Sequence, residues 1–245
     1  MAHAIRIHRN GGPEVLVWEE IPVPAPGPGE ARVRQRAVGV NFIDVYQRTG
    51  LYPVTLPAVL GQEGAGVVEA VGPGETDVAV GDRVAYGGIP GAYAEVRTVP
   101  AEWLVKLPDG IDDELAAAVM LKGMTAEFLL RRSHRVSSGE TIVFHAAAGG
   151  VGQIACQWAK ALGATVIGTV GSAAKVDVAR RHGCDHVVLT TEGELIVAPR
   201  SPEKFEELRR YKVADGQTWA HPVVLGSRVV IRDAGSVAVW SILRS

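Results

Sequence analysis

The sequence predicts an α/β protein with three successive regions. Short strand-like runs separated by Gly- and Pro-rich turns fill residues 1–110. A strand, a glycine-rich turn and a helix follow one another over residues 141–162, and the pattern changes again after Glu192. These three observations predict a mostly β region, an incomplete βαβαβ unit, and a tail made of one helix and an antiparallel meander.

Composition restricts the class of protein. The 245 residues are enough for two domains, and 25 basic against 27 acidic residues give no signal for nucleic-acid or anionic-membrane binding. No apolar run reaches membrane-spanning length, and the N-terminus lacks the apolar core of a signal peptide. Two cysteines, Cys156 and Cys184, cannot build a disulfide framework, so we expect a reducing compartment, the cytoplasm.

Turn residues divide the first region into short strands, as expected of an irregular β-barrel. Turn residues such as Gly72-Pro-Gly74 and Gly87-Gly88 separate its runs. The expected strands are 15–20, 30–38, 64–71, 82–86 and 92–96. A short helix is expected after Asn41, a good N-cap residue, and would carry Asp44 and Tyr46.

From Asp112 the spacing of apolar residues becomes helical. Helices are expected at 113–120 and 125–131, followed by a linker at Ser137-Ser-Gly139. The βαβαβ unit then comprises strand 141–144, helix 151–162, strand 165–169, helix 173–182 and strand 186–189. Parallel strands joined by helices predict a sheet covered on both faces.

The glycine-rich turn between 144 and 151 has the context of a dinucleotide-binding loop. Its pattern is Ala147-x-Gly149-x-x-Gly152, with Ala where the first Gly usually stands. Gly149 would let the backbone approach a pyrophosphate, and Gly152 would let helix and strand pack closely. Gly150 and Val151 open the helix, whose free N–H groups favour phosphate. The alternative is a plain tight turn between a strand and a helix.

The end of the second βαβ strand indicates which cofactor is used. NAD-binding proteins usually place a carboxylate there to grip the ribose 2′-hydroxyl. This chain instead has Ser172 and Lys175, and a hydroxyl and an ammonium suit a 2′-phosphate through charge-assisted hydrogen bonds. The sequence therefore favours NADPH. The alternative for Lys175 is a solvated lysine on a helix.

Seven motifs, in order along residues 1 to about 190, carry a family resemblance. They are Gly11-Gly-Pro-Glu-Val-Leu16, Asn41-Phe-Ile-Asp-Val-Tyr46, Gly50-Leu-Tyr-Pro53, Gly61-Gln-Glu-Gly-Ala-Gly66, Gly81-Asp-Arg-Val84, Leu121-Lys-Gly-Met-Thr125 and the glycine loop. Together they resemble the medium-chain dehydrogenase/reductase superfamily, in its zinc-free, zeta-crystallin-like quinone oxidoreductase branch. The resemblance implies a GroES-like substrate domain over 1–124 and the first half of a Rossmann domain over 125–192, with the active-site cleft between them. It also implies reduction of a quinone or enone by NADPH, commonly in a homodimer.

The candidate site residues follow from these motifs. Asn41, Asp44, Tyr46 and Tyr52 lie in segments that line the substrate cleft in the family, where an amide or phenol donor would stabilise charge on a carbonyl oxygen. For each of these residues a structural role in capping or packing remains the alternative. The resemblance also places Lys122 and Thr125 on the cofactor side.

No metal site is expected. The superfamily's alcohol dehydrogenases carry a zinc-ligating His where this chain has Gln62, and no Cys occurs in residues 1–155. The neighbouring Glu63 stays open between a functional and a structural carboxylate.

The resemblance stops before the second Rossmann half. Only 53 residues remain from Gly193 to Ser245, and they read as a helix at 201–208 and a meander over 222–240. The meander is similar to the last blade of a quinoprotein-type β-propeller repeat. The sequence therefore leaves three hypotheses open: a truncated reductase, an NADPH-binding fragment without catalysis, or a chimeric fusion product.

Overall fold

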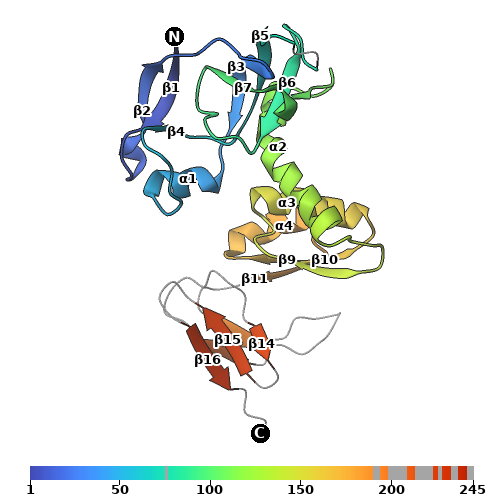
Figure 1. Ribbon diagram of the computed structural model, residues 1–245. Helices are drawn as coiled ribbons and strands as arrows, with labels where there is room; N and C mark the ends of the chain where they lie inside the picture. Colours follow the sequence, from blue (N-terminus) through green and yellow to red (C-terminus); the bar gives the residue numbers. More distant parts are fainter. Residues whose placement is uncertain are drawn as a thin grey trace. The chain divides into compact units, whose positions relative to one another are not determined.

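The computed structural model describes residues 1–74 and 77–189, together with five later strands. The chain divides into two compact units, residues 1–132 and residues 133–245. Figure 1 shows the helices and strands of each unit.

Unit 1 is mostly β. Its strands are β1 (Ala2–Ile7), β2 (Val17–Ile21), β3 (Glu30–Gly39), β4 (Ala58–Val59), β5 (Glu63–Val71), β6 (Arg83–Gly87), β7 (Val96–Pro100) and β8 (Val105–Lys106). Its helical elements are η1 (Pro13–Val15), α1 (Phe42–Thr49), η2 (Ala101–Trp103), α2 (Asp113–Glu127) and the π-helical turn η3 (Phe128–Ser133).

The strands of unit 1 form two antiparallel sheets, so the irregular barrel that the sequence predicted is not closed by the described strands. One sheet has the order β7-β3-β5-β6-β8 and the other the order β2-β1-β4. In the described residues, a single isolated bridge between Ala4 and Ala94 joins them. The segment before β7 lies between the two sheets: the Glu95 carbonyl accepts from the Gln35 N–H of β3 at 2.8 Å, and the Glu95 N–H donates to the His3 carbonyl of β1 at 2.9 Å.

Two strands differ from the expected positions. The strand expected at 92–96 begins at Val96, because the Gln35 amide holds the Ala94 carbonyl at 2.8 Å in a non-strand segment. β1 was not expected, yet its inward side chains Ala4 and Ile7 are fully buried. Its polar residues His3 and Arg6 interrupt the apolar run and concealed this strand.

The core of unit 1 has a part between strands and a part beneath a helix. Val33, Val84 and Val99 are fully buried in the first part. In the second part, Ala116 and Ala117 of α2 pack against Ala65 and Ala85. Small side chains here let α2 lie close to the five-stranded sheet. The two helices expected at 113–120 and 125–131 are one continuous α2, with only the end passing into η3.

Unit 2 begins with the expected βαβαβ unit. Its elements are β9 (Thr141–Phe144), α3 (Gly150–Ala161), β10 (Thr165–Val170), η4 (Ala173–Lys175), α4 (Val176–Arg181) and β11 (His186–Leu189). The strands are parallel in the order β11-β10-β9, and α3 and α4 lie on one side of them (Figure 1).

The expectation of a sheet covered on both faces is not met by the described elements. Two successive right-handed crossovers that step in the same direction place both helices on one face. Covering the other face takes a crossover in the opposite direction, which the second half of a doubly wound sheet supplies. Accordingly, Val143 of β9 is 57% exposed.

The tail forms separate antiparallel pairs. β12 (Glu194–Val197) pairs with β13 (Arg209–Lys212), and β14 (Val223–Leu225), β15 (Arg228–Arg232) and β16 (Val237–Ser241) form the predicted meander. No described tail strand pairs with β11. The helix expected at 201–208 lies outside the described residues, and the likeness to a propeller blade stays a prediction.

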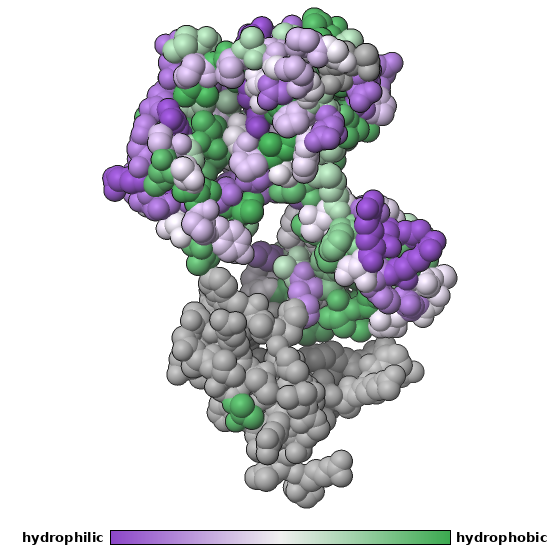
Figure 2. All heavy atoms as spheres, viewed as in Figure 1, coloured by the Kyte–Doolittle hydropathy of each residue, from purple (hydrophilic) through white to green (hydrophobic). Residues whose placement is uncertain are grey.

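The surface of the described residues is mixed in character. Figure 2 shows polar and apolar residues interspersed over the visible face of unit 1. Among the described residues, we find no helix whose length and hydropathy would let it cross a bilayer.

Candidate functional site

A buried carboxylate joins three segments of unit 1. Glu63, the first residue of β5, is 0% exposed. Its Oε1 accepts hydrogen bonds from Asn41 Nδ2 at 2.8 Å and from Lys122 Nζ at 2.6 Å. Its Oε2 accepts from the Leu121 N–H at 2.7 Å. Three donors, one of them charged, compensate for the loss of hydration that burial imposes on the carboxylate.

The start of α1 is fixed by a second carboxyl group. Asp44 is 4% exposed, and its Oδ2 accepts from the Asn41 N–H and from the Tyr93 hydroxyl, each at 2.8 Å. Burial raises the pKa of Asp44 above its ordinary value, although these two bonds act in the opposite direction. Burial also raises the pKa of Tyr93, so its hydroxyl keeps the proton that it donates. These hydrogen bonds give Asp44 a structural role at the start of α1.

The two tyrosine candidates lie apart from these carboxyl groups. The rings of Tyr46 and Tyr52 are tilted relative to each other, with their centroids 5.3 Å apart. The ring centroids of Phe42 and Tyr46 are 5.6 Å apart. Phe42 is mostly exposed and Tyr52 is half exposed. The structure thus brings Tyr46 and Tyr52 together. It links Asn41 to Lys122 through Glu63. Asp44 is instead hydrogen-bonded to Tyr93.

A cavity of about 470 Å³ opens on the Asp44 side of α1. Leu16 and Trp18 contribute to its apolar wall, and Asp44 and Arg48 contribute polar atoms. Asn41, Tyr46 and Tyr52 do not line it. The cavity is therefore separate from the other predicted site residues of unit 1.

Lys122 and Thr125 lie on successive turns of α2. The Thr125 hydroxyl donates to the Leu121 carbonyl at 2.7 Å, so its proton is committed within the helix and its oxygen remains an acceptor. Lys122 is 20% exposed, which leaves its ammonium accessible at the surface of the Glu63 cluster.

The glycine loop of unit 2 has the predicted form. Gly149 is the N-cap of α3, and no side chain of the described residues caps this helix. Gly149 and Gly150 are exposed, so the first N–H groups of α3, including that of Val151, are available to an anion. Ala147 is buried beneath the loop and packs beside Gly168 of β10.

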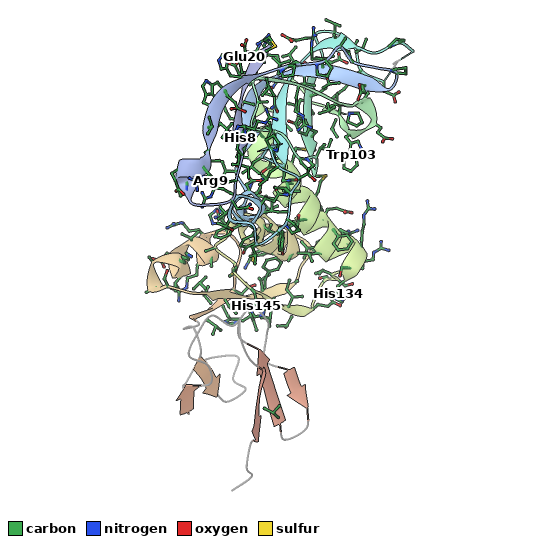
Figure 3. All side chains as sticks on the ribbon, turned by 60° about the vertical axis from the view of Figure 1, so that its left-hand side comes forward. His8, Arg9, Glu20, Trp103, His134 and His145 are labelled. Atoms are coloured by element: carbon green, nitrogen blue, oxygen red, sulfur yellow. The ribbon has the colours of Figure 1, made fainter. Side chains whose placement is uncertain are left out.

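Close packing explains Gly152. A Cβ at this position would lie 2.7 Å from both the carbonyl carbon and the Cα of Ala147, and would run into the Ala146 carbonyl oxygen. Ala146 itself has φ of 51°, a left-handed conformation that is uncommon for alanine. The loop before it carries His145, which Figure 3 labels near the end of β9. His145 Nδ1 lies 3.0 Å from Thr169 Oγ1, linking β9 to β10.

Ser172 and Lys175 lie at the same edge of this sheet. Both are exposed and follow β10, whereas the glycine loop follows β9. Because β9 and β10 are adjacent and parallel, their carboxyl ends meet at one edge, where nucleotides bind in open α/β sheets. Ala147, Gly149–Gly152, Ser172 and Lys175 are therefore neighbouring groups around one edge.

The residues described in unit 1 and unit 2 contain no group of three or more His, Cys, Asp or Glu that could hold a metal ion. At the position of the family's zinc-ligating His, the Gln62 amide donates to Gln47 Oε1 at 3.2 Å.

Family models match both units. Residues 27–109 match the alcohol dehydrogenase GroES-like domain, and residues 150–210 match the zinc-binding dehydrogenase model. With a GroES-like region followed by a Rossmann-type parallel sheet, the chain has over these matches the fold of the medium-chain dehydrogenase/reductase superfamily.

Individual relatives narrow the resemblance. A quinone oxidoreductase of Pseudomonas aeruginosa is 59% identical over 185 residues, covering 75% of this chain and 57% of the relative. A 2-haloacrylate reductase of Burkholderia sp is 50% identical over 195 residues, covering 77% and 59%. The crystal structure of Escherichia coli quinone oxidoreductase complexed with NADPH has a TM-score of 0.74 at 48% identity, covering 76% and 58%. The chain thus spans less than two thirds of the length of these relatives.

Sequence reasoning left one site feature open and missed another. Glu63 was left open, although a Glu inside an otherwise apolar and glycine-rich strand start is a signal for a compensated buried charge. Tyr93, the partner of Asp44, lies 49 residues away along the chain, and no local pattern marks that pairing.

Proposed function

We propose that this chain is an NADPH-dependent quinone reductase. The observation that carries the proposal is the uncapped N-terminus of α3 in the glycine loop, with Lys175 at the end of the neighbouring strand. The relatives named quinone oxidoreductase support quinones as the substrate class.

The residues of unit 2 fit a phosphorylated dinucleotide. The N–H groups of Gly150 and Val151 and the helix dipole favour a pyrophosphate, and Ser172 and Lys175 favour a 2′-phosphate. NADPH, when bound, supplies the hydride. In unit 1, Asn41, Tyr46 and Tyr52 are the donors that would orient the carbonyl of the acceptor. Asp44 supports α1 and thereby the position of Asn41.

The domain limits 1–124, 125–192 and 193–245 remain our proposal for how the chain is organised. Only the family likeness favours a homodimer. The sequence shows no recognisable second Rossmann half that could add support for it. The buried free thiols of Cys156 and Cys184 support a location in the cytoplasm.

A second candidate function is binding of NADPH without turnover. It is favoured by the three-stranded sheet of unit 2, in which no described tail strand pairs with β11. Calorimetric titration with NADPH and with 2′-phospho-ADP-ribose separates the two. Equal affinity supports the binding module, because the nicotinamide then contributes nothing. Tighter binding of NADPH supports the reductase.

A comparison of two substrate classes tests which compound accepts the hydride from NADPH. The relatives named 2-haloacrylate reductase favour an activated C=C bond as the alternative to a quinone. Initial rates of NADPH oxidation by the purified full chain are measured with 1,4-benzoquinone and with 2-chloroacrylate, each corrected for the rate without protein. A higher kcat/KM for the quinone supports the proposal. Turnover of 2-chloroacrylate alone would replace the quinone by an enone-type acceptor.

A further inference from the structure

The cavity of about 470 Å³ is formed by unit 1 alone, from residues of both of its sheets and of α1. Ile5 of β1, Val38 of β3 and Val45 of α1 are among the apolar residues of its wall. Its volume lies in the range of sites that hold small molecules, about 300–1,000 Å³. The walls of this cavity therefore define a candidate ligand site within one compact unit.

One oxygen of the Asp44 carboxyl group lacks a partner at this cavity. Oδ2 accepts from the Asn41 N–H and from the Tyr93 hydroxyl. Oδ1 has no hydrogen-bond partner among the residues that the structure describes, although Asp44 is only 4% exposed and lines the cavity. A buried oxygen without a partner costs free energy, which a hydrogen-bond donor on a ligand would recover.

Arg48 supplies a donor on the same face of α1. It lies one helical turn after Asp44 and lines the cavity, and its buried Nε–H has no hydrogen-bond partner in the described part of the chain. Two further polar side chains of the wall already have partners. Glu95 accepts from a backbone N–H of β1 at 2.9 Å, and the Gln35 amide donates to a backbone carbonyl at 2.8 Å. The cavity therefore offers a free acceptor in Asp44 and a free donor in Arg48.

The charged groups of the wall balance one another. Arg36 and Arg48 are the cationic residues that line the cavity, and Asp44 and Glu95 are the anionic ones. A wall of zero net formal charge gives no net attraction to a cation or to an anion. The ligand that suits it is therefore uncharged.

Trp18 gives the apolar wall a flat surface. Its side chain is 56% exposed and lines the cavity. His3 stacks on the Trp18 ring with the centroids 5.3 Å apart and an interplanar angle of 12°, but His3 does not line the cavity. The cavity therefore meets another side of the indole, where the ring of a ligand can pack.

We propose that this cavity binds an uncharged aromatic hydroxyl compound, a phenol or a naphthol. The ring of the ligand packs beside Trp18, its O–H donates to Asp44 Oδ1, and its oxygen accepts from Arg48 Nε. The site is separate from that of the proposed hydride acceptor, because Tyr46 and Tyr52 do not line the cavity. The proposal does not rest on the reductase function, since it involves neither NADPH nor turnover.

Calorimetric titration of the purified full chain, without NADPH, tests this assignment. 1-Naphthol and 1-methoxynaphthalene have the same rings, but only the naphthol has a hydrogen-bond donor. We expect 1-naphthol to bind about 10-fold more tightly, the factor for one hydrogen bond to a charged group. Equal affinities would overturn the proposal. Tighter binding of 1-naphthoate or of 1-naphthylmethylammonium than of 1-naphthol would also overturn it, because the site would then select an ion.

Asp44→Asn tests the acceptor. The amide oxygen is needed by the Asn41 N–H and the Tyr93 hydroxyl, so the amide nitrogen takes the place of Oδ1 and offers a donor instead. The preference for 1-naphthol over 1-methoxynaphthalene should therefore disappear. Asp82→Asn is the control, because Asp82 pairs with Lys106 at the surface, and it should keep the preference. A preference that survives in Asp44→Asn contradicts the proposal.

Two tryptophans of similar exposure locate the ligand. Trp18 and Trp103 are 56% and 47% exposed, and of the two Trp18 alone lines the cavity. Trp18→Ala should weaken the binding of 1-naphthol by about 10-fold, whereas Trp103→Ala should leave the Kd unchanged. Equal effects of the two substitutions would overturn the assignment. Because Trp18 is more than half exposed, this comparison stays decisive even where Asp44→Asn does not fold.

Tyr52→Phe separates this site from that of the quinone. It should bind 1-naphthol as the wild-type chain does, because Tyr52 does not line the cavity. A loss of affinity in Tyr52→Phe with none in Trp18→Ala would place the naphthol beside Tyr52. That result would overturn the cavity assignment and leave the reductase proposal standing.

Discussion

Replacing Gly152 by alanine tests the packing of the dinucleotide loop. The added Cβ would lie 2.7 Å from the carbonyl carbon and Cα of Ala147, which are backbone atoms that no side-chain rotation can move away. Overpacking of this kind costs about 1–3 kcal/mol. The substitution also gains about 1 kcal/mol of helix propensity, so we expect a net loss of up to about 2 kcal/mol.

Gly123 provides a matched control. It also lies within a helix, α2, but a Cβ there meets no atom within 4 Å. Gly123→Ala should therefore gain about 0.5–1 kcal/mol from helix propensity alone. The same substitution is expected to have opposite signs at the two positions.

Hydrogen exchange measured by mass spectrometry resolves the two helices. In Gly152→Ala, amides of α3 should exchange faster, by up to about 30-fold, the factor that corresponds to a loss of about 2 kcal/mol. In Gly123→Ala, amides of α2 should exchange more slowly. Equal or slower exchange of α3 in Gly152→Ala would refute the packing argument.

Three further outcomes are expected. Lys175→Ala should weaken NADPH binding relative to NADH by about 10-fold, as for one charge-assisted hydrogen bond, whereas Lys106→Ala should leave the Kd ratio unchanged; an unaltered ratio in Lys175→Ala contradicts the 2′-phosphate assignment. Burial raises the pKa of Asp44 above 3.8, so its contribution to stability is complete below that pH and is lost as pH rises through the folded-state pKa. The Tm of the wild-type chain minus that of Asp44→Asn should accordingly fall with rising pH, and a difference that rises with pH would oppose this reading. Burial raises the pKa of Cys156 from 9.0 to about 12, so iodoacetamide should alkylate it at least about 1000-fold more slowly in the folded chain than in denaturant, and equal rates would exclude the buried thiol.

Local patterns predicted the parts of the fold that local chemistry determines. Asn41 is the N-cap of α1, Gly149 is the N-cap of α3, and β14, β15 and β16 pair in chain order as the predicted meander. Each of these boundaries depends on residues next to one another in the chain.

Features that depend on distant contacts could not be read in the same way. The two sheets of unit 1 meet through the residues before β7, which bond to both β3 and β1, and this pairing joins segments far apart in the chain. The placement of α3 and α4 on one face depends on strand order. The Asp44–Tyr93 and Glu63–Lys122 pairs join residues that are 49 and 59 positions apart.

The candidate site was predicted as a set of residue types and resolved by the structure into separate groups. Asn41 and Lys122, expected on the substrate and cofactor sides, share one partner in Glu63. Tyr46 and Tyr52 form an aromatic pair, and Asp44 supports the start of the helix that carries Tyr46.

The central proposal is reduction of a quinone by NADPH in this chain. The most direct measurement is anaerobic incubation of the purified full chain with equal amounts of NADPH and 1,4-benzoquinone, with chromatographic quantification of hydroquinone and NADP⁺. We expect the two products in equal amounts, formed faster than without protein. Formation at the protein-free rate, by a chain that is folded and binds NADPH, would contradict the reductase assignment and leave a dinucleotide-binding module.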